Sequence, residues 1–172
     1  VRESDAAYDS YVAVTASSQL TAGERYLLTY VSGSSTYAVK NELYSTSYYP
    51  KMDSVSLSST VGSGYYWTLG GSTGAWTFSN GSDYIGFDSS GYPAFSDSTG
   101  TYITWKLTYS SGFYISNTDW SADTYTHLCY NAGYLYRSTS ANADAFKLYK
   151  VVSNSELSYS ENGTLNTGYG TA

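Results

Sequence analysis

The sequence of 172 residues has very few of the side chains on which enzyme chemistry depends. It contains one cysteine, Cys129, and one histidine, His127. One cysteine allows no intramolecular disulfide, and one Cys with one His is too few to complete a zinc site. Neither a Gly-x-Ser-x-Gly elbow nor a phosphate-binding glycine loop is present. We interpret Cys129 as a small core residue, and the sequence predicts no enzyme, no metal site and no cofactor.

Basic residues are also few. Eight Lys and Arg stand against fourteen Asp and Glu, which gives a net charge of -6. Nucleic-acid binding needs a Lys/Arg surface that neutralises phosphates, and binding to anionic membranes needs the same. No apolar run approaches the length of a transmembrane helix. We therefore expect no nucleic-acid partner and no membrane insertion.

Tyrosine, by contrast, is abundant, with 22 copies in a chain that is 18% aromatic. Tyr, Trp, Thr and Val favour strands, whereas the numerous Ser, Gly and Asn favour turns. No long window shows the apolar spacing of a helix, so we expect an all-β fold. Pro50 indicates a long loop from Leu43 to Asp53, because proline is excluded from central strands.

One pattern of aromatic, polar and apolar residues occurs three times, at 67–69 (Trp-Thr-Leu), 105–107 (Trp-Lys-Leu) and 146–148 (Phe-Lys-Leu). Side chains alternate along a strand, so Trp105 and Leu107 are expected inside and Lys106 outside. The copies predict three units of four strands, twelve in all. A further strand at residues 11–14 is expected to lie beside residues 146–152.

Three such units around a pseudo-threefold axis would bury their apolar stripes and leave no free sheet edge. This arrangement resembles a β-trefoil, a six-stranded barrel capped by three hairpins, over residues 24–152. A two-sheet jelly roll and an up-and-down barrel remain alternatives. We expect a disordered lead at residues 1–7, a single domain at 8–153, and a flexible linker or tail at 154–172.

Two short motifs also resemble a module of surface or secreted proteins of gut bacteria. The first covers residues 11–30, with Tyr11, Thr15, Leu20, Gly23 and a Tyr-Leu-Leu-x-Tyr strand, and the second is Phe-Lys-Leu-Tyr-Lys at residues 146–150. The resemblance implies a non-catalytic appendage of a larger protein, located outside the cell or at its surface. We expect this domain to be monomeric.

Ricin-type trefoil lectins bind sugar in shallow pockets after the second strand of each unit. Their Gln-x-Trp signature is absent here, yet the matching loops are rich in tyrosine. A tyrosine ring stacks on the apolar face of a sugar, while polar side chains bind its hydroxyl groups. Trp120 is expected to be an exposed loop aromatic. The candidate ligand-binding residues are Tyr44, Tyr48, Tyr49, Asp88, Tyr92, Trp120, Asn131, Tyr134 and Arg137.

These residues favour a binding module, and the ligand expected first is a carbohydrate (a glycan). The alternative is adhesion to a host surface protein, such as an immunoglobulin or a matrix component, or a spacer role between other domains. Inhibition of a protease through the long loop at residues 43–53 is a further alternative.

Overall fold

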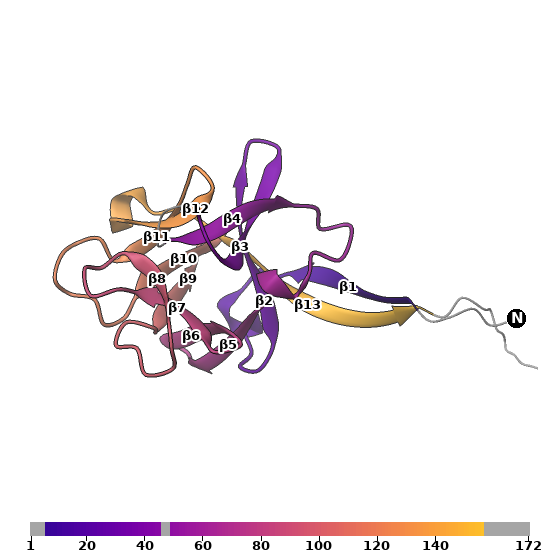
Figure 1. Ribbon diagram of the computed structural model, residues 1–172, viewed down its shortest axis with the longest axis horizontal. Helices are drawn as coiled ribbons and strands as arrows, with labels where there is room; N and C mark the ends of the chain where they lie inside the picture. The colour runs from indigo at the N-terminus through magenta and orange to yellow at the C-terminus, as the bar shows by residue number, and fades with distance from the viewer. Residues whose placement is uncertain (1–5, 46–48, 157–172) are drawn as a thin grey trace, which may run out of the picture.

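The computed structural model describes residues 6–45 and 49–156, and these residues form an all-β protein (Figure 1). Thirteen strands, all paired antiparallel, make up one large sheet in this part of the chain. The strands are β1 (Ala6–Ala13), β2 (Arg25–Ser32), β3 (Ser35–Leu43), β4 (Pro50–Val55), β5 (Trp67–Ser72), β6 (Ala75–Asn80), β7 (Asp83–Phe87), β8 (Pro93–Ser96), β9 (Trp105–Tyr109), β10 (Phe113–Asn117), β11 (His127–Asn131), β12 (Tyr134–Ser138) and β13 (Lys147–Glu156).

Three short 3₁₀ turns lie between these strands: η1 (Ser17–Gln19), η2 (Ser63–Tyr65) and η3 (Ser140–Asn142). Within the described residues, no helix is long and apolar enough to cross a membrane. The all-β class expected from composition is therefore confirmed.

Six of the strands pair in a closed ring. The order is β2, β5, β6, β9, β10 and β13, and β13 pairs with β2 to close it. Between β10 and β13 the ring is closed by an isolated bridge that joins Phe113 to Phe146, the residue just before β13. The remaining body strands form three hairpins, β3–β4, β7–β8 and β11–β12. Closure of the ring leaves its strands without free edges.

The repeated three-residue pattern lines this core as predicted. Trp105 is fully buried and Leu107 nearly so, while Lys106 between them is exposed. Each buried indole also needs an acceptor for its N–H group. Trp67 Nε1 donates to the Val39 carbonyl at 3.0 Å, and Trp105 Nε1 donates to the Ile85 carbonyl at 2.8 Å.

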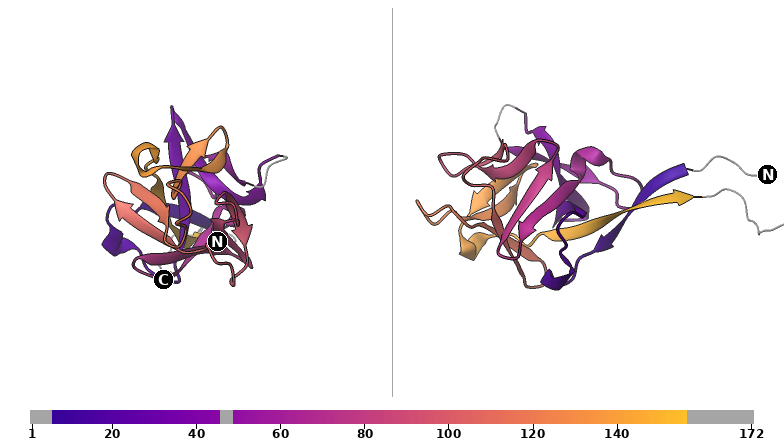
Figure 2. Two further views of the ribbon diagram at one scale, coloured as in Figure 1. Left: turned by 90° about the vertical axis from the view of Figure 1, so that its left-hand side faces the viewer. Right: turned by 90° about the horizontal axis from the view of Figure 1, so that it is seen from below.

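The strand expected at residues 11–14 pairs with β13, as predicted. Together β1 and β13 form a two-stranded ribbon that projects from the body in two perpendicular views (Figures 1 and 2). Their pairing runs from Ala13 back to Ala6, opposite Glu156, so strand structure reaches beyond the expected limits at 8 and 153. The Asp9 amide donates to Thr60 Oγ1 at 2.9 Å, which ties the ribbon to the body.

The long loop expected from Leu43 to Asp53 is wrong over its second half. Strand β4 begins at Pro50, which lies opposite Leu43, and it runs to Val55. Proline is tolerated as the first residue of a strand, where its missing N–H interrupts little of the ladder. Residues 56 and 57, which follow β4, lie outside any strand.

Candidate functional site

Five tyrosine rings meet where the hairpins converge, and we call them the tyrosine cluster: Tyr44, Tyr49, Tyr92, Tyr134 and Tyr136. Neighbouring ring centroids are 5.0 to 6.1 Å apart, within the range of favourable aromatic contacts. All five side chains are partly exposed. Tyr44 and Tyr49 come from the β3–β4 connection, Tyr92 precedes β8, and the other two are on β12.

Pairing between β12 and β4 brings these distant segments together. Tyr134 lies opposite Lys51, and the Met52 amide donates to the Gly133 carbonyl at 2.8 Å. Gly133 has a φ of +98°, and a Cβ atom at that position would lie 3.1 Å from the Tyr44 ring. Glycine therefore serves both the turn and the close approach of Tyr44.

A guanidinium group borders the cluster. Arg137 lies 3.8 Å from the ring centroid of Tyr92 and 4.8 Å from that of Tyr125, both at cation–π distance. It also forms an ion pair with Asp123 at 3.5 Å. Only 15% of the Arg137 side chain is exposed, so these contacts hold the guanidinium in one place.

Asp123 is itself held by two N–H groups. Trp120 Nε1 and the Tyr125 amide each donate to Asp123 Oδ1 at 2.9 Å. These hydrogen bonds, with a smaller contribution from the Arg137 charge, lower the pKa of the Asp123 carboxyl group. The carboxylate is consequently ionised at neutral pH and available as an acceptor beside the cluster.

The hydroxyl group of Tyr49 stays protonated. Burial raises its pKa above the ordinary value of 10.0, and the neighbouring Tyr136, Tyr92 and Tyr134 raise it further. Tyr49 therefore presents a neutral ring with a hydroxyl group that can both donate and accept hydrogen bonds.

Trp120 contradicts its prediction as an exposed loop aromatic. It is only 8% exposed, and its ring makes edge-to-face contacts with Phe87 and Tyr102 at 6.1 and 5.0 Å. The ring also covers Gly91. Trp120 is buried because the loop after β10 folds back onto the core, and it reaches the site through its hydrogen bond to Asp123.

The other predicted residues are placed as follows. Tyr44, Tyr49, Tyr92, Tyr134 and Arg137 come together, as described above. Asp88 Oδ1 accepts the amides of Ser90 and Tyr92 at 2.9 and 3.0 Å, so it shapes the loop that carries Tyr92. Asn131 lies at the exposed end of β11, opposite Tyr134. Tyr48 lies outside the described residues.

Three residues of the site were not predicted from the sequence. Tyr136 is two positions after Tyr134 on one strand, and this spacing alone places both on the same face. Asp123 and Tyr125 lie in the loop between β10 and β11, and no periodic pattern in the sequence marks them.

Cys129 and His127 both lie on β11, and both are partly buried. Burial, and then the charge of Asp144, raise the pKa of the Cys129 thiol to about 11, so it is protonated at neutral pH. Cys129 is partly buried, and its S–H group donates to the Arg137 carbonyl at 3.4 Å. Burial lowers the pKa of His127. No group of three or more potential metal-ligating side chains occurs in the described part of the chain.

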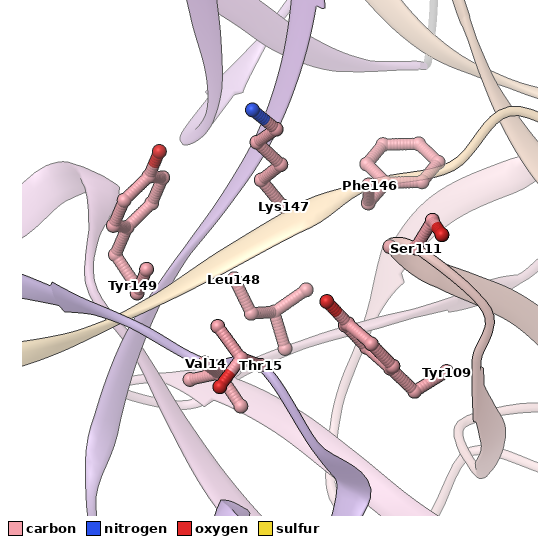
Figure 3. A pocket seen from close by; sticks show the side chains of 10 residues that line it. Val14, Thr15, Tyr109, Ser111, Phe146, Lys147, Leu148 and Tyr149 are labelled. Carbon is pink, nitrogen blue, oxygen red and sulfur yellow. The ribbon is translucent and has the colours of Figure 1, made fainter.

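A pocket of about 210 Å³ lies elsewhere, between the end of β1, the β9–β10 turn and the start of β13. In Figure 3 the Tyr109 hydroxyl points toward Leu148, and the floor of the pocket is largely apolar. None of the eight predicted site residues that the structure describes lines this pocket.

The sequence matches no protein-family model, and a search of curated proteins finds no match. The described residues define an all-β protein with one large antiparallel sheet and a partly exposed tyrosine cluster. Its function must therefore be inferred from its own residues.

Proposed function

We propose that this chain is a non-catalytic, extracellular binding module that recognises carbohydrate through the tyrosine cluster. The observation that carries the proposal is the convergence of five partly exposed tyrosine rings on one surface, from three separate hairpins. Aromatic rings carried by separate hairpins would normally be buried in the core or scattered over the surface. Gathered on a surface, they offer a large contact area at a low cost in side-chain entropy.

The chemistry of the cluster suits a sugar. The C–H groups on one face of a pyranose ring pack against an aromatic ring, and the hydroxyl groups at its edge need donors and acceptors. The tyrosine hydroxyl groups do both, the Arg137 guanidinium donates, and the Asp123 carboxylate accepts. Arg137 and Asp123 are also fixed before a ligand arrives, by Tyr92, Tyr125 and Trp120. Fixed polar groups lose little entropy on binding.

We also propose that the fold is a β-trefoil. The closed ring of six strands and the three hairpins supply the number and order of elements that this fold requires. In addition, β5 and β9 carry Trp67 and Trp105, whose indoles bond to equivalent hairpin strands, β3 and β7. An up-and-down barrel would pair consecutive strands, whereas β2 pairs with β5 and β6 pairs with β9. The extra strand β1 lies outside the ring, against β13.

A glycan array with purified protein tests the proposed function. We expect binding to a restricted set of glycans, and we expect Tyr92→Ala and Tyr134→Ala to abolish it. Tyr8→Ala is a matched control, because Tyr8 is a 45% exposed tyrosine on the projecting ribbon, remote from the cluster. Equal signals from all four proteins would show that the cluster does not bind the glycan.

Adhesion to a protein is the second candidate, and one observation favours it. The tyrosine rings contact one another without interruption and are bordered by Arg137 and the 45% exposed Tyr125, and Tyr and Arg are enriched in protein hot spots. A blank glycan array, together with capture of an extracellular protein that Tyr92→Ala fails to capture, would favour this candidate over carbohydrate.

A further inference from the structure

The aromatic contacts of the site extend from Tyr44 to Tyr92, and they are two rings wide in the middle, where Tyr136 contacts Tyr49, Tyr92 and Tyr134. Tyr44 contacts Tyr134 at 5.0 Å between ring centroids, Tyr134 contacts Tyr49 at 5.2 Å, and Tyr49 contacts Tyr92 at 6.0 Å. Each of these distances is about the width of one aromatic ring. A single sugar unit packs on one or two such rings, so the series offers several stacking positions.

Arg137 extends the series past the cluster. Its guanidinium lies 3.8 Å from the ring centroid of Tyr92 and 4.8 Å from that of Tyr125, so it links Tyr125 to the cluster. Tyr125 is the most exposed ring of the set, at 45%. We call the whole series, from Tyr44 to Tyr125, the tyrosine run.

The charges along the tyrosine run are balanced. Arg137 is paired with Asp123 at 3.5 Å. Lys51, opposite Tyr134 on β4, is paired with Glu42 at 3.5 Å and with Asp53 at 3.6 Å. The net charge of the whole chain is -6. A ligand that carries negative charge would meet no unpaired cation at these positions and would be repelled by the protein as a whole.

We infer that the tyrosine run binds a neutral oligosaccharide lengthwise, with Tyr44 near one end of the ligand and Tyr125 near the other. This inference rests on the proposed function and specifies its ligand as a neutral chain of several sugar units. The half-buried rings between the two ends supply the central stacking positions, and Arg137 donates hydrogen bonds to sugar hydroxyl groups near the Tyr125 end.

Isothermal titration calorimetry of the whole chain, with cello-, xylo-, manno- and chito-oligosaccharides of one to six units, tests this inference. For the type of oligosaccharide that binds, we expect Kd to fall by about five- to ten-fold for each added ring contact. Kd should stop falling once the oligosaccharide is long enough to span the tyrosine run. In Tyr125→Ala the affinity should stop rising at a shorter oligosaccharide than in the wild type. Tyr8→Ala, which removes an equally exposed ring on β1, should behave as the wild type.

Different failures of this experiment are distinguishable. A monosaccharide that binds as tightly as the hexasaccharide would overturn the inference and leave the proposed function standing. Tighter binding of oligogalacturonate than of a neutral oligosaccharide of equal length would overturn the requirement for a neutral ligand. If none of these sugars binds and the glycan array is also blank, the proposed function fails and the inference fails with it.

Discussion

Replacing Gly91 with alanine tests the position of Trp120, on which Asp123 and Arg137 depend. Gly91 is buried, with a φ of +81°, and an added Cβ atom would lie 2.6 Å from Trp120 Cε2. The indole has little room to retreat, because Phe87 contacts it edge-on and its Nε1 is bonded to Asp123. The added methyl group must therefore displace a packed ring.

Two costs combine in Gly91→Ala. A left-handed backbone conformation costs a non-glycine residue about 1–2 kcal/mol. An extra methyl group in a packed core costs about 1–3 kcal/mol more. We therefore expect a total loss of about 2–5 kcal/mol in the free energy of unfolding. Gly74→Ala is the matched control, because Gly74 has a φ of +88° and no atom lies within 4 Å of the added Cβ. It should lose only the backbone contribution, about 1–2 kcal/mol.

Urea unfolding followed by tryptophan fluorescence measures both variants. The expected difference between them, about 1–3 kcal/mol, corresponds to roughly 2–12 °C in Tm for a domain of this size. An equal loss in the two variants would mean that Trp120 does not pack on Gly91, and the exposed position expected from the sequence would then be correct. A larger loss in Gly91→Ala, accompanied by weaker glycan binding, would show that Trp120 supports Asp123 and the site.

Two further predictions concern ionisable side chains. Burial, and then a hydrogen bond to Asp53, raise the pKa of Tyr65 to about 12, so the folded protein holds a proton that the unfolded chain releases near its ordinary value of 10.0. The resulting stabilisation is complete below pH 10 and is lost as the pH rises toward 12. Urea unfolding across this range should therefore show a smaller loss of unfolding free energy in Tyr65→Phe than in the wild type. Equal losses in the two proteins would contradict this prediction. The Cys129 thiol, with its pKa raised to about 11, should react slowly with iodoacetamide at pH 7.5 in the folded protein and much faster in urea, and similar rates in both states would show that the thiol is not shielded.

Alternation along strands made part of this fold predictable. Trp105 and Leu107 face the core and Lys106 faces solvent because side chains on a strand point alternately to opposite sides. The turn from Asn80 to Asp83 was equally predictable, because asparagine followed by glycine favours a tight hairpin. In the structure Asn80 and Asp83 lie opposite each other, on β6 and β7. Both inferences need only residues that are close in the sequence.

The position of Trp120 could not be predicted in the same way. Its loop has no periodic pattern, and its partners Phe87, Gly91 and Tyr102 belong to earlier segments of the chain. The candidate site could be predicted only in part from the sequence. Loop composition identified Tyr92 and Tyr134 individually, but their approach depends on the pairing of β12 with β4 and on the convergence of the hairpins.

The aromatic residues of this chain fall into two groups with different physical demands. Trp67 and Trp105 are fully buried, and each indole N–H group donates to the carbonyl of a hairpin strand. A change there removes a buried hydrogen bond and weakens the whole fold. The rings of the tyrosine cluster are partly exposed, and their hydroxyl groups can exchange hydrogen bonds to water for hydrogen bonds to a ligand at little cost. Substitutions in the cluster therefore should change what the protein binds more than whether it folds, because the ring of six strands is built without them.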